Sequence, residues 1–121
     1  MSMMLITKPI RRQLLINGAS DLLAIAKDGN TKDHIPVLKL FTPWRSCTWL
    51  FTSMYPDNED LLFGLCDLGM DCVELGDVYL PELVAITGPF GLKIERDRMF
   101  HTNRPLSEYT AEGREKGRLV A

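Results

Sequence analysis

The sequence predicts an α+β fold: a mainly antiparallel sheet of four or five strands, an N-terminal helix, a short helix near Pro81–Thr87 and a C-terminal helix. Three apolar runs rich in β-branched and aromatic residues indicate the central strands, at Val37–Thr42, Thr48–Tyr55 and Leu61–Leu68. Only short turn-forming segments separate these runs. Such connections favour hairpins, because a parallel crossover needs about a dozen residues or more.

Two short helices are predicted before the first strand. Thr7 can cap a helix over Lys8–Ile16, because its hydroxyl can accept a hydrogen bond from a free backbone N–H, and Asn17-Gly18 should stop that helix. Ser20 can cap a second helix, which should end at Gly29. Both helices are expected to pack against the sheet.

The second half of the chain predicts two more strands and two helices. A fourth strand is expected over Val73–Leu80, and Pro81–Thr87 should form one or two helical turns, since proline suits the start of a helix. The run Lys93–Phe100 alternates in charge sign, which is typical of an edge strand. Ser107 can cap a last helix, which glycines should weaken so that residues 113–121 fray.

Length and composition indicate one soluble domain over residues 1–121. Of the 121 residues, 45% are hydrophobic and 25% are charged, ordinary values for a globular domain. No apolar run reaches the roughly 18 residues of a membrane span, and the N-terminus lacks the pattern of a signal peptide. Three cysteines, an odd number without a secretory signal, favour free thiols in a reducing compartment. We therefore expect a cytoplasmic protein with no membrane partner.

Acidic and basic residues are segregated along the chain. The segment from Ser46 to Leu92 holds eight acids and no Lys or Arg, and the segments on either side carry a basic excess. One interpretation is that the basic ends pack across the acidic middle. The other is that the acidic segment forms a face for a basic partner. The net charge of −2 disfavours wholesale DNA binding, which usually needs a clear basic excess.

Several sequence blocks resemble a known bacterial family. The blocks are VLKLFTP, TWLFT, LLFGLCDLG, ELGDVYLPEL and GPFGLKIERDRMF, followed by RPLSEY. Together they resemble the family catalogued as domain of unknown function 2958, over Ile35–Tyr109 with a weaker echo in Leu5–Gly18. The chain departs from the family at Asp71-Cys72-Val73, where a Phe-Pro is common. The resemblance implies a mobile-element setting, in plasmids, integrative elements or phages, and it implies no chemistry or catalytic residue.

Clustered carboxylates raise the possibility of a metal site. Asp67, Glu74 and Asp77 are close in sequence, and hard cations bind carboxylate oxygens, so a small metal-dependent hydrolase or nuclease is one alternative. The spacing matches no calcium loop, and solvated turn carboxylates are the simpler explanation. Asp67 should be partly buried and accept hydrogen bonds from a turn or an arginine.

The cysteines and histidines lack zinc-site spacing, and a thiol within an apolar run, such as Cys66, should be buried and inert. We predict no cofactor.

Charged and aromatic residues near turns and strand ends form a candidate binding surface. Trp44 lies in a turn beside Arg45, and an exposed Trp next to an Arg is typical of an interface anchor. The other candidates are polar residues near the ends of the later strands, namely Asp67, Glu74, Asp77, Glu95, Arg96 and Asp97. Glu95–Asp97 could equally pair with neighbouring strands.

These observations predict an accessory protein of a mobile genetic element that binds a protein partner, such as a DNA-transfer or host-defence component. The prediction depends on the absence of a catalytic motif, the segregated acids and the family resemblance. Direct nucleic-acid binding is a separate alternative, through Arg11, Arg12, Arg96, Arg98 and the Arg114–Arg118 tail.

Overall fold

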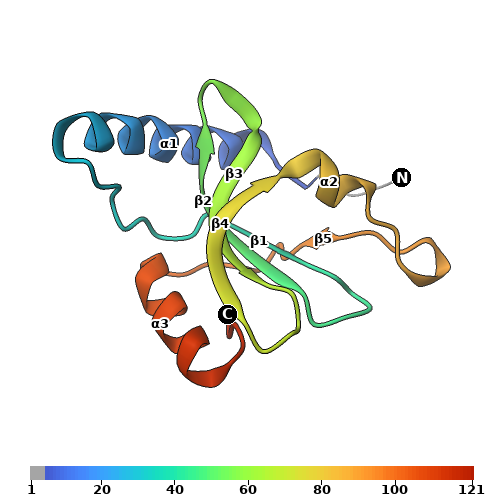
Figure 1. The fold of residues 1–121 in the computed structure, drawn as a ribbon. Helices are drawn as coiled ribbons and strands as arrows, with labels where there is room; N and C mark the ends of the chain where they lie inside the picture. The colour runs from blue at the N-terminus through green and yellow to red at the C-terminus, as the bar shows by residue number, and fades with distance from the viewer. Residues whose placement is uncertain (1–4) are drawn as a thin grey trace.

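Five antiparallel strands form one sheet in the computed structural model, which describes residues 5–121 (Figure 1). The strands are β1 (Leu38–Phe41), β2 (Thr48–Tyr55), β3 (Asn58–Asp67), β4 (Val73–Tyr79) and β5 (Glu95–Arg96). Their order in the sheet is β4-β3-β2-β1-β5, and every neighbouring pair is antiparallel. With helices before, after and between the strands, the chain has the predicted α+β fold.

The first four strands form successive hairpins, as the short connections predict. The chain then returns to the other side of β1, where Glu95 pairs with Phe41 and Arg96 with Leu40. The charged run over residues 93–100 therefore contains the edge strand that the sequence predicts, although only two of its residues join the sheet. β3 begins earlier than predicted, because the acidic turn after Tyr55 continues directly into it.

One long helix, α1 (Lys8–Asp28), replaces the two predicted helices. Thr7 caps its start, with Oγ1 3.4 Å from the N–H of Ile10, and Gly29 ends it in a left-handed conformation, both as predicted. The predicted stop at Asn17-Gly18 is wrong. No helix in the described part of the chain, α1 included, is both long and apolar enough to cross a bilayer.

The Asn-Gly pair is instead the place where α1 packs most closely against β2. A Cβ added at Gly18 would lie 1.9 Å from the carbonyl oxygen of Met54. The buried Asn17 side chain donates a hydrogen bond to the carbonyl of Thr52, with a donor–acceptor distance of 2.8 Å. These contacts with the sheet override the local stop signal, so the helix continues for another ten residues.

The sheet is covered by helices on both faces. On one face, α1 and α2 (Leu80–Ala85) pack against a core that includes Leu14, Leu38, Phe51 and Leu83. On the other face, α3 (Leu106–Lys116) covers a smaller cluster with Leu50 and Leu65 at its centre. α2 corresponds to the predicted helix near Pro81–Thr87, and a 3-10 turn, η1 (Pro89–Gly91), follows it.

The start of α3 is capped by a residue far away in the sequence. Ser107 was the predicted cap, but Pro105 occupies the cap position and makes no side-chain hydrogen bond there. The carboxylate of Asp33 accepts hydrogen bonds from the Ser107 N–H, at 3.0 Å, and from the Ser107 hydroxyl. The carbonyl of His34 accepts a further bond from the N–H of Leu106, at 2.9 Å. The segment after α1 therefore supplies the cap that local sequence does not.

The end of the chain is hydrogen-bonded to the sheet. α3 continues through the buried Gly113, which packs against Val73, and ends at Gly117. The N–H of Leu119 donates to the Asp67 carboxylate at 2.9 Å, and the Lys39 ammonium donates to the carbonyl of Ala121 at 3.0 Å. These two bonds involve residues 119 and 121, which lie in the segment 113–121 that the sequence predicts to fray. Whether this segment frays stays a prediction.

Candidate functional site

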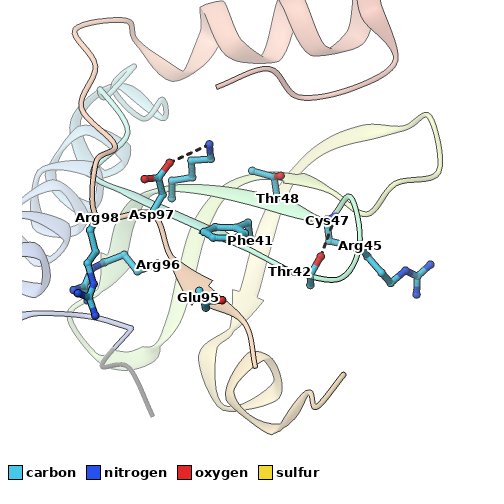
Figure 2. A pocket seen from close by; sticks show the side chains of 10 residues that line it. Phe41, Thr42, Arg45, Cys47, Thr48, Glu95, Arg96, Asp97 and Arg98 are labelled. Atoms are coloured by element: carbon cyan, nitrogen blue, oxygen red, sulfur yellow. Dashed lines mark hydrogen bonds and ion pairs between the residues drawn. The ribbon is translucent and has the colours of Figure 1, made fainter. Parts of the chain in front are cut away.

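An open groove of about 570 Å³ lies where β1, the β1–β2 turn and β5 meet (Figure 2). It brings together four of the eight predicted surface residues, Arg45, Glu95, Arg96 and Asp97. The remaining lining residues are Lys39, Phe41, Thr42, Cys47, Thr48 and Arg98. Segments some fifty residues apart in the sequence thus share one concave surface, because β5 pairs with β1.

The floor of the groove follows from the alternation of side chains along β1. Leu38 and Leu40 are buried in the core that α1 covers. Since neighbouring residues of a strand point to opposite faces, Lys39 and Phe41 face the other way, and both are half-buried. Figure 2 shows the Phe41 ring in the middle of the groove. The groove therefore has an apolar centre surrounded by polar and charged side chains.

The rim carries both charge signs, with a basic excess of two. Lys39 forms an ion pair with Asp97, with Nζ and Oδ2 3.3 Å apart, and the other Asp97 oxygen accepts a bond from the N–H of Met99. The guanidinium groups of Arg45 and Arg98 make no hydrogen bond or ion pair with any residue from 5 to 121. In Figure 2, Arg45 extends away on the side opposite Arg96 and Arg98. Two arginines at separate ends are thus available to a ligand.

Trp44 is not the exposed anchor that the sequence predicts. Its side chain is half-buried and packs against the core on the α1 face. The ring lies so close to the backbone of Gly88 that a Cβ there would be 2.4 Å from it. Trp44 therefore holds the β1–β2 turn against the loop after α2, while its exposed neighbour Arg45 reaches the groove.

The three carboxylates of the predicted metal cluster are not brought together. Paired residues of β3 and β4 share a face, and Asp67 pairs with Val73 whereas Glu74 pairs with Cys66, so Asp67 and Glu74 are on opposite faces. Asp77 shares the face of Asp67 but lies four residues along β4, about 13 Å away at 3.3 Å per residue. Within residues 5–121, no group of three or more His, Cys, Asp or Glu side chains is placed to hold a metal ion.

Each of these carboxylates has a partner within the protein. Asp67 is buried and accepts hydrogen bonds from the N–H groups of Gly69 and Leu119, each at 2.9 Å, which confirms the predicted bond from a turn. Asp77 accepts a bond from the Tyr55 hydroxyl at 2.6 Å. Burial, together with this bond, raises the pKa of Tyr55 to about 12. Glu74 accepts a bond from the Cys72 thiol at 3.3 Å.

Two of the three thiols, those of Cys66 and Cys72, are poorly suited to nucleophilic chemistry. Burial raises the pKa of Cys66 to about 11, with a further contribution from Glu74, so this thiol is protonated at neutral pH. The hydrogen bond to Glu74 raises the pKa of the exposed Cys72 as well. All three cysteines are free. Cys66, which the sequence predicts to be buried, is half-buried, and its inertness stays a prediction.

The charge segregation has a partial structural explanation. Arg11 of the basic N-terminal segment forms an ion pair with Glu59 of the acidic segment, with Nη1 and Oε1 3.2 Å apart. This contact supports packing of a basic end across the acidic middle at one point. The two side chains are 40% and 53% exposed, so water screens the pair and it adds little to the free energy of unfolding.

The binding surface predicted from the sequence lacks six residues of the groove, namely Lys39, Phe41, Thr42, Cys47, Thr48 and Arg98, of which only Arg98 was a candidate elsewhere, for nucleic-acid binding. A signal for the first two is present: they alternate with Leu38 and Leu40, which marks them as the opposite face of the first strand. Arg98 carries no comparable local signal. Its position depends on the return of the chain to β1, which periodicity within one strand does not specify.

Comparison with known proteins gives one result. No curated protein and no solved structure matches the chain significantly. A family model described as "Protein of unknown function (DUF2958)" matches residues 5–120. This match includes all of α1 and α3 and so extends on both sides of the block Ile35–Tyr109. The chain therefore belongs to the DUF2958 family of proteins of unknown function.

Proposed function

We propose that this protein is a non-enzymatic, cytoplasmic accessory protein of a bacterial mobile genetic element, and that it acts by binding a protein partner at the β1–β5 groove. The observation that supports a binding role is that Arg45, Glu95, Arg96 and Asp97 line one groove, with Phe41 in its middle. The mobile-element setting, with a DNA-transfer or host-defence component as the partner, rests on the family resemblance alone.

The composition of the groove favours a protein over a nucleic acid. Protein interfaces combine an apolar centre with a polar rim and are enriched in aromatic residues and arginine, as this groove is. Glu95 and Asp97 would repel a phosphate backbone. The basic excess, carried by the unpaired Arg45 and Arg98, complements an acidic segment of the partner.

The bases proposed for nucleic-acid binding do not line one common groove. Arg11 is paired with Glu59, and Arg114 lines a different cavity from Arg96 and Arg98. A continuous basic track is what gives a nucleic-acid site its affinity and its steep salt dependence. Nucleic-acid binding therefore stays the weaker proposal.

The test is a pull-down from a bacterial host that carries the element, with and without nuclease. The baits are the wild-type chain, the double variant Arg45→Glu/Arg98→Glu and a matched control, Arg12→Glu, which changes an exposed arginine of α1 outside the groove. We expect one defined protein to survive nuclease treatment with the wild type and the control and to be lost with the double variant. Recovery of nucleic acid alone, or equal capture by all three baits, would refute the proposal.

A further inference from the structure

A second cavity, of about 420 Å³, lies between α1, the segment after it and α3. Figure 1 shows this segment running from the end of α1 between the two helices. Asp21 of α1, Lys32 and His34 of the segment, and Arg114 of α3 line the cavity, with Phe63 and Leu75 of the sheet beneath them. None of these residues belongs to the β1–β5 groove.

The acids of this cavity already have donors within the protein. The Asp21 carboxylate contacts His34, with Oδ1 and Nε2 2.7 Å apart, and its other oxygen accepts a bond from the Ser53 hydroxyl at 2.8 Å. The Asp21 and His34 side chains are only 15% and 14% exposed. Asp33 is occupied by the N–H and hydroxyl of Ser107. These bonds hold the segment against both helices and occupy the carboxylate oxygens, although the negative charges remain.

The bases of the cavity have no such partners. The side chains of Lys32 and Arg114 form no hydrogen bond, ion pair or ring contact with the rest of the described chain. Both residues are exposed and line the same cavity from opposite elements. With His34 neutral, the formal charges of the two carboxylates and the two bases that line the cavity sum to zero. The carboxylate oxygens are held by donors within the protein, whereas both cations keep their donors free for a charge-assisted hydrogen bond to an anion.

The wall next to these bases is apolar. Leu75, on the edge strand β4, is 42% exposed, and Phe63, on the neighbouring strand β3, is half-buried. A smaller pocket of about 120 Å³, lined in part by Leu22, Ile25 and Met54, adjoins the cavity and shares Asp21, Thr31 and Phe63 with it. An apolar surface beside two unpaired cations suits a ligand with an anionic head and an apolar body.

We propose that this cavity binds a small organic anion. A phosphate monoester or carboxylate group lies between Lys32 and Arg114, and a flat apolar body rests on Phe63 and Leu75. The contact between His34 and Asp21 holds the segment that carries Lys32. This site is independent of the partner-binding groove, so either proposal can fail without the other.

The test is a titration of the ¹⁵N-labelled protein followed by its amide NMR spectrum. The probes are phenyl phosphate, benzoate, inorganic phosphate and phenol, which separate the anionic head from the apolar body. We expect phenyl phosphate or benzoate to shift the amides of residues 31–34 and 106–114 and to bind more tightly than inorganic phosphate or phenol. Arg114→Gln and Lys32→Gln should each weaken binding by about tenfold, the effect of one charge-assisted contact. Arg118→Gln, at an exposed arginine that lines neither cavity, should leave it unchanged.

Three results would overturn the proposal. One is the absence of shifts at these amides with both organic anions at saturating concentration. Another is equal affinity for inorganic phosphate and phenyl phosphate, which would remove the role of the apolar wall. The third is equal weakening by Arg114→Gln and Arg118→Gln, which would indicate attraction to general surface charge. Because Lys32 and Arg114 are exposed, their variants should keep the wild-type spectrum elsewhere.

Discussion

Replacing Gly18 by alanine tests the packing of α1 against β2. In an isolated helix this change stabilises by about 1 kcal/mol, because alanine has the higher helix propensity. In this protein the new Cβ would lie 1.9 Å from the Met54 carbonyl oxygen and 2.9 Å from its carbonyl carbon. A normal carbon–oxygen contact is at least about 3.3 Å, so the helix and the strand must move apart by more than about 1 Å. Both atoms are backbone, so no flexible side chain can give way.

The expected cost exceeds the gain in helix propensity. Overpacking costs about 1–3 kcal/mol, and the same movement weakens the buried hydrogen bond from Asn17 to Thr52, worth about 1–3 kcal/mol. The net prediction for Gly18→Ala is a loss of about 2–4 kcal/mol in the free energy of unfolding, measured by urea denaturation with circular dichroism. Ala19→Gly, at the exposed neighbouring position, is the control and should cost only about 1 kcal/mol. A stabilised Gly18→Ala variant would show that α1 does not pack on β2 in this way.

Three further predictions concern hydrogen bonds described above. Because the pKa of Tyr55 is raised from 10.0 to about 12, the folded state holds its proton longer than the unfolded state, so stability should fall as the pH rises through this interval. Urea denaturation at several pH values should show that Tyr55→Phe removes this part of the fall. Asp33→Ala should lower the free energy of unfolding by about 1 kcal/mol, since α3 loses its cap, and an unchanged urea midpoint would contradict this. Hydrogen exchange at the Leu119 amide should be slower than at its neighbours and should accelerate in Asp67→Ala; fast exchange in the wild type would show that the tail frays.

The strands could be predicted because their signals are local. Apolar runs bounded by turn formers specify the first three hairpin strands, and the alternating charges over residues 93–100 specify an edge. The helix ends depend on contacts between distant residues and were less predictable. Asn17-Gly18 has the composition of a helix stop but fits against β2, and the cap of α3 comes from Asp33. A local sequence window contains no information on either contact.

The candidate site was predictable only in part, for the same reason. Arg45, Glu95, Arg96 and Asp97 were predicted from charge and turn position, and the return of the chain to β1 places them in one groove. Trp44 has the composition of an anchor, yet it packs on Gly88, about forty residues later in the chain. Exposure of a single aromatic side chain is decided by such tertiary contacts.

The cap on α3 also constrains the order in which the protein can fold. An 11-residue helix is marginal by itself in water, and the carboxylate that caps this one is 74 residues earlier in the chain. α3 can therefore gain its full stability only after the segment behind α1 has settled against the sheet. Closing a loop of that length costs conformational entropy before any contact is gained, which slows the step. We therefore expect α3 to form late in folding. The rate of that step should be sensitive to substitutions in the segment after α1, which contains Asp33.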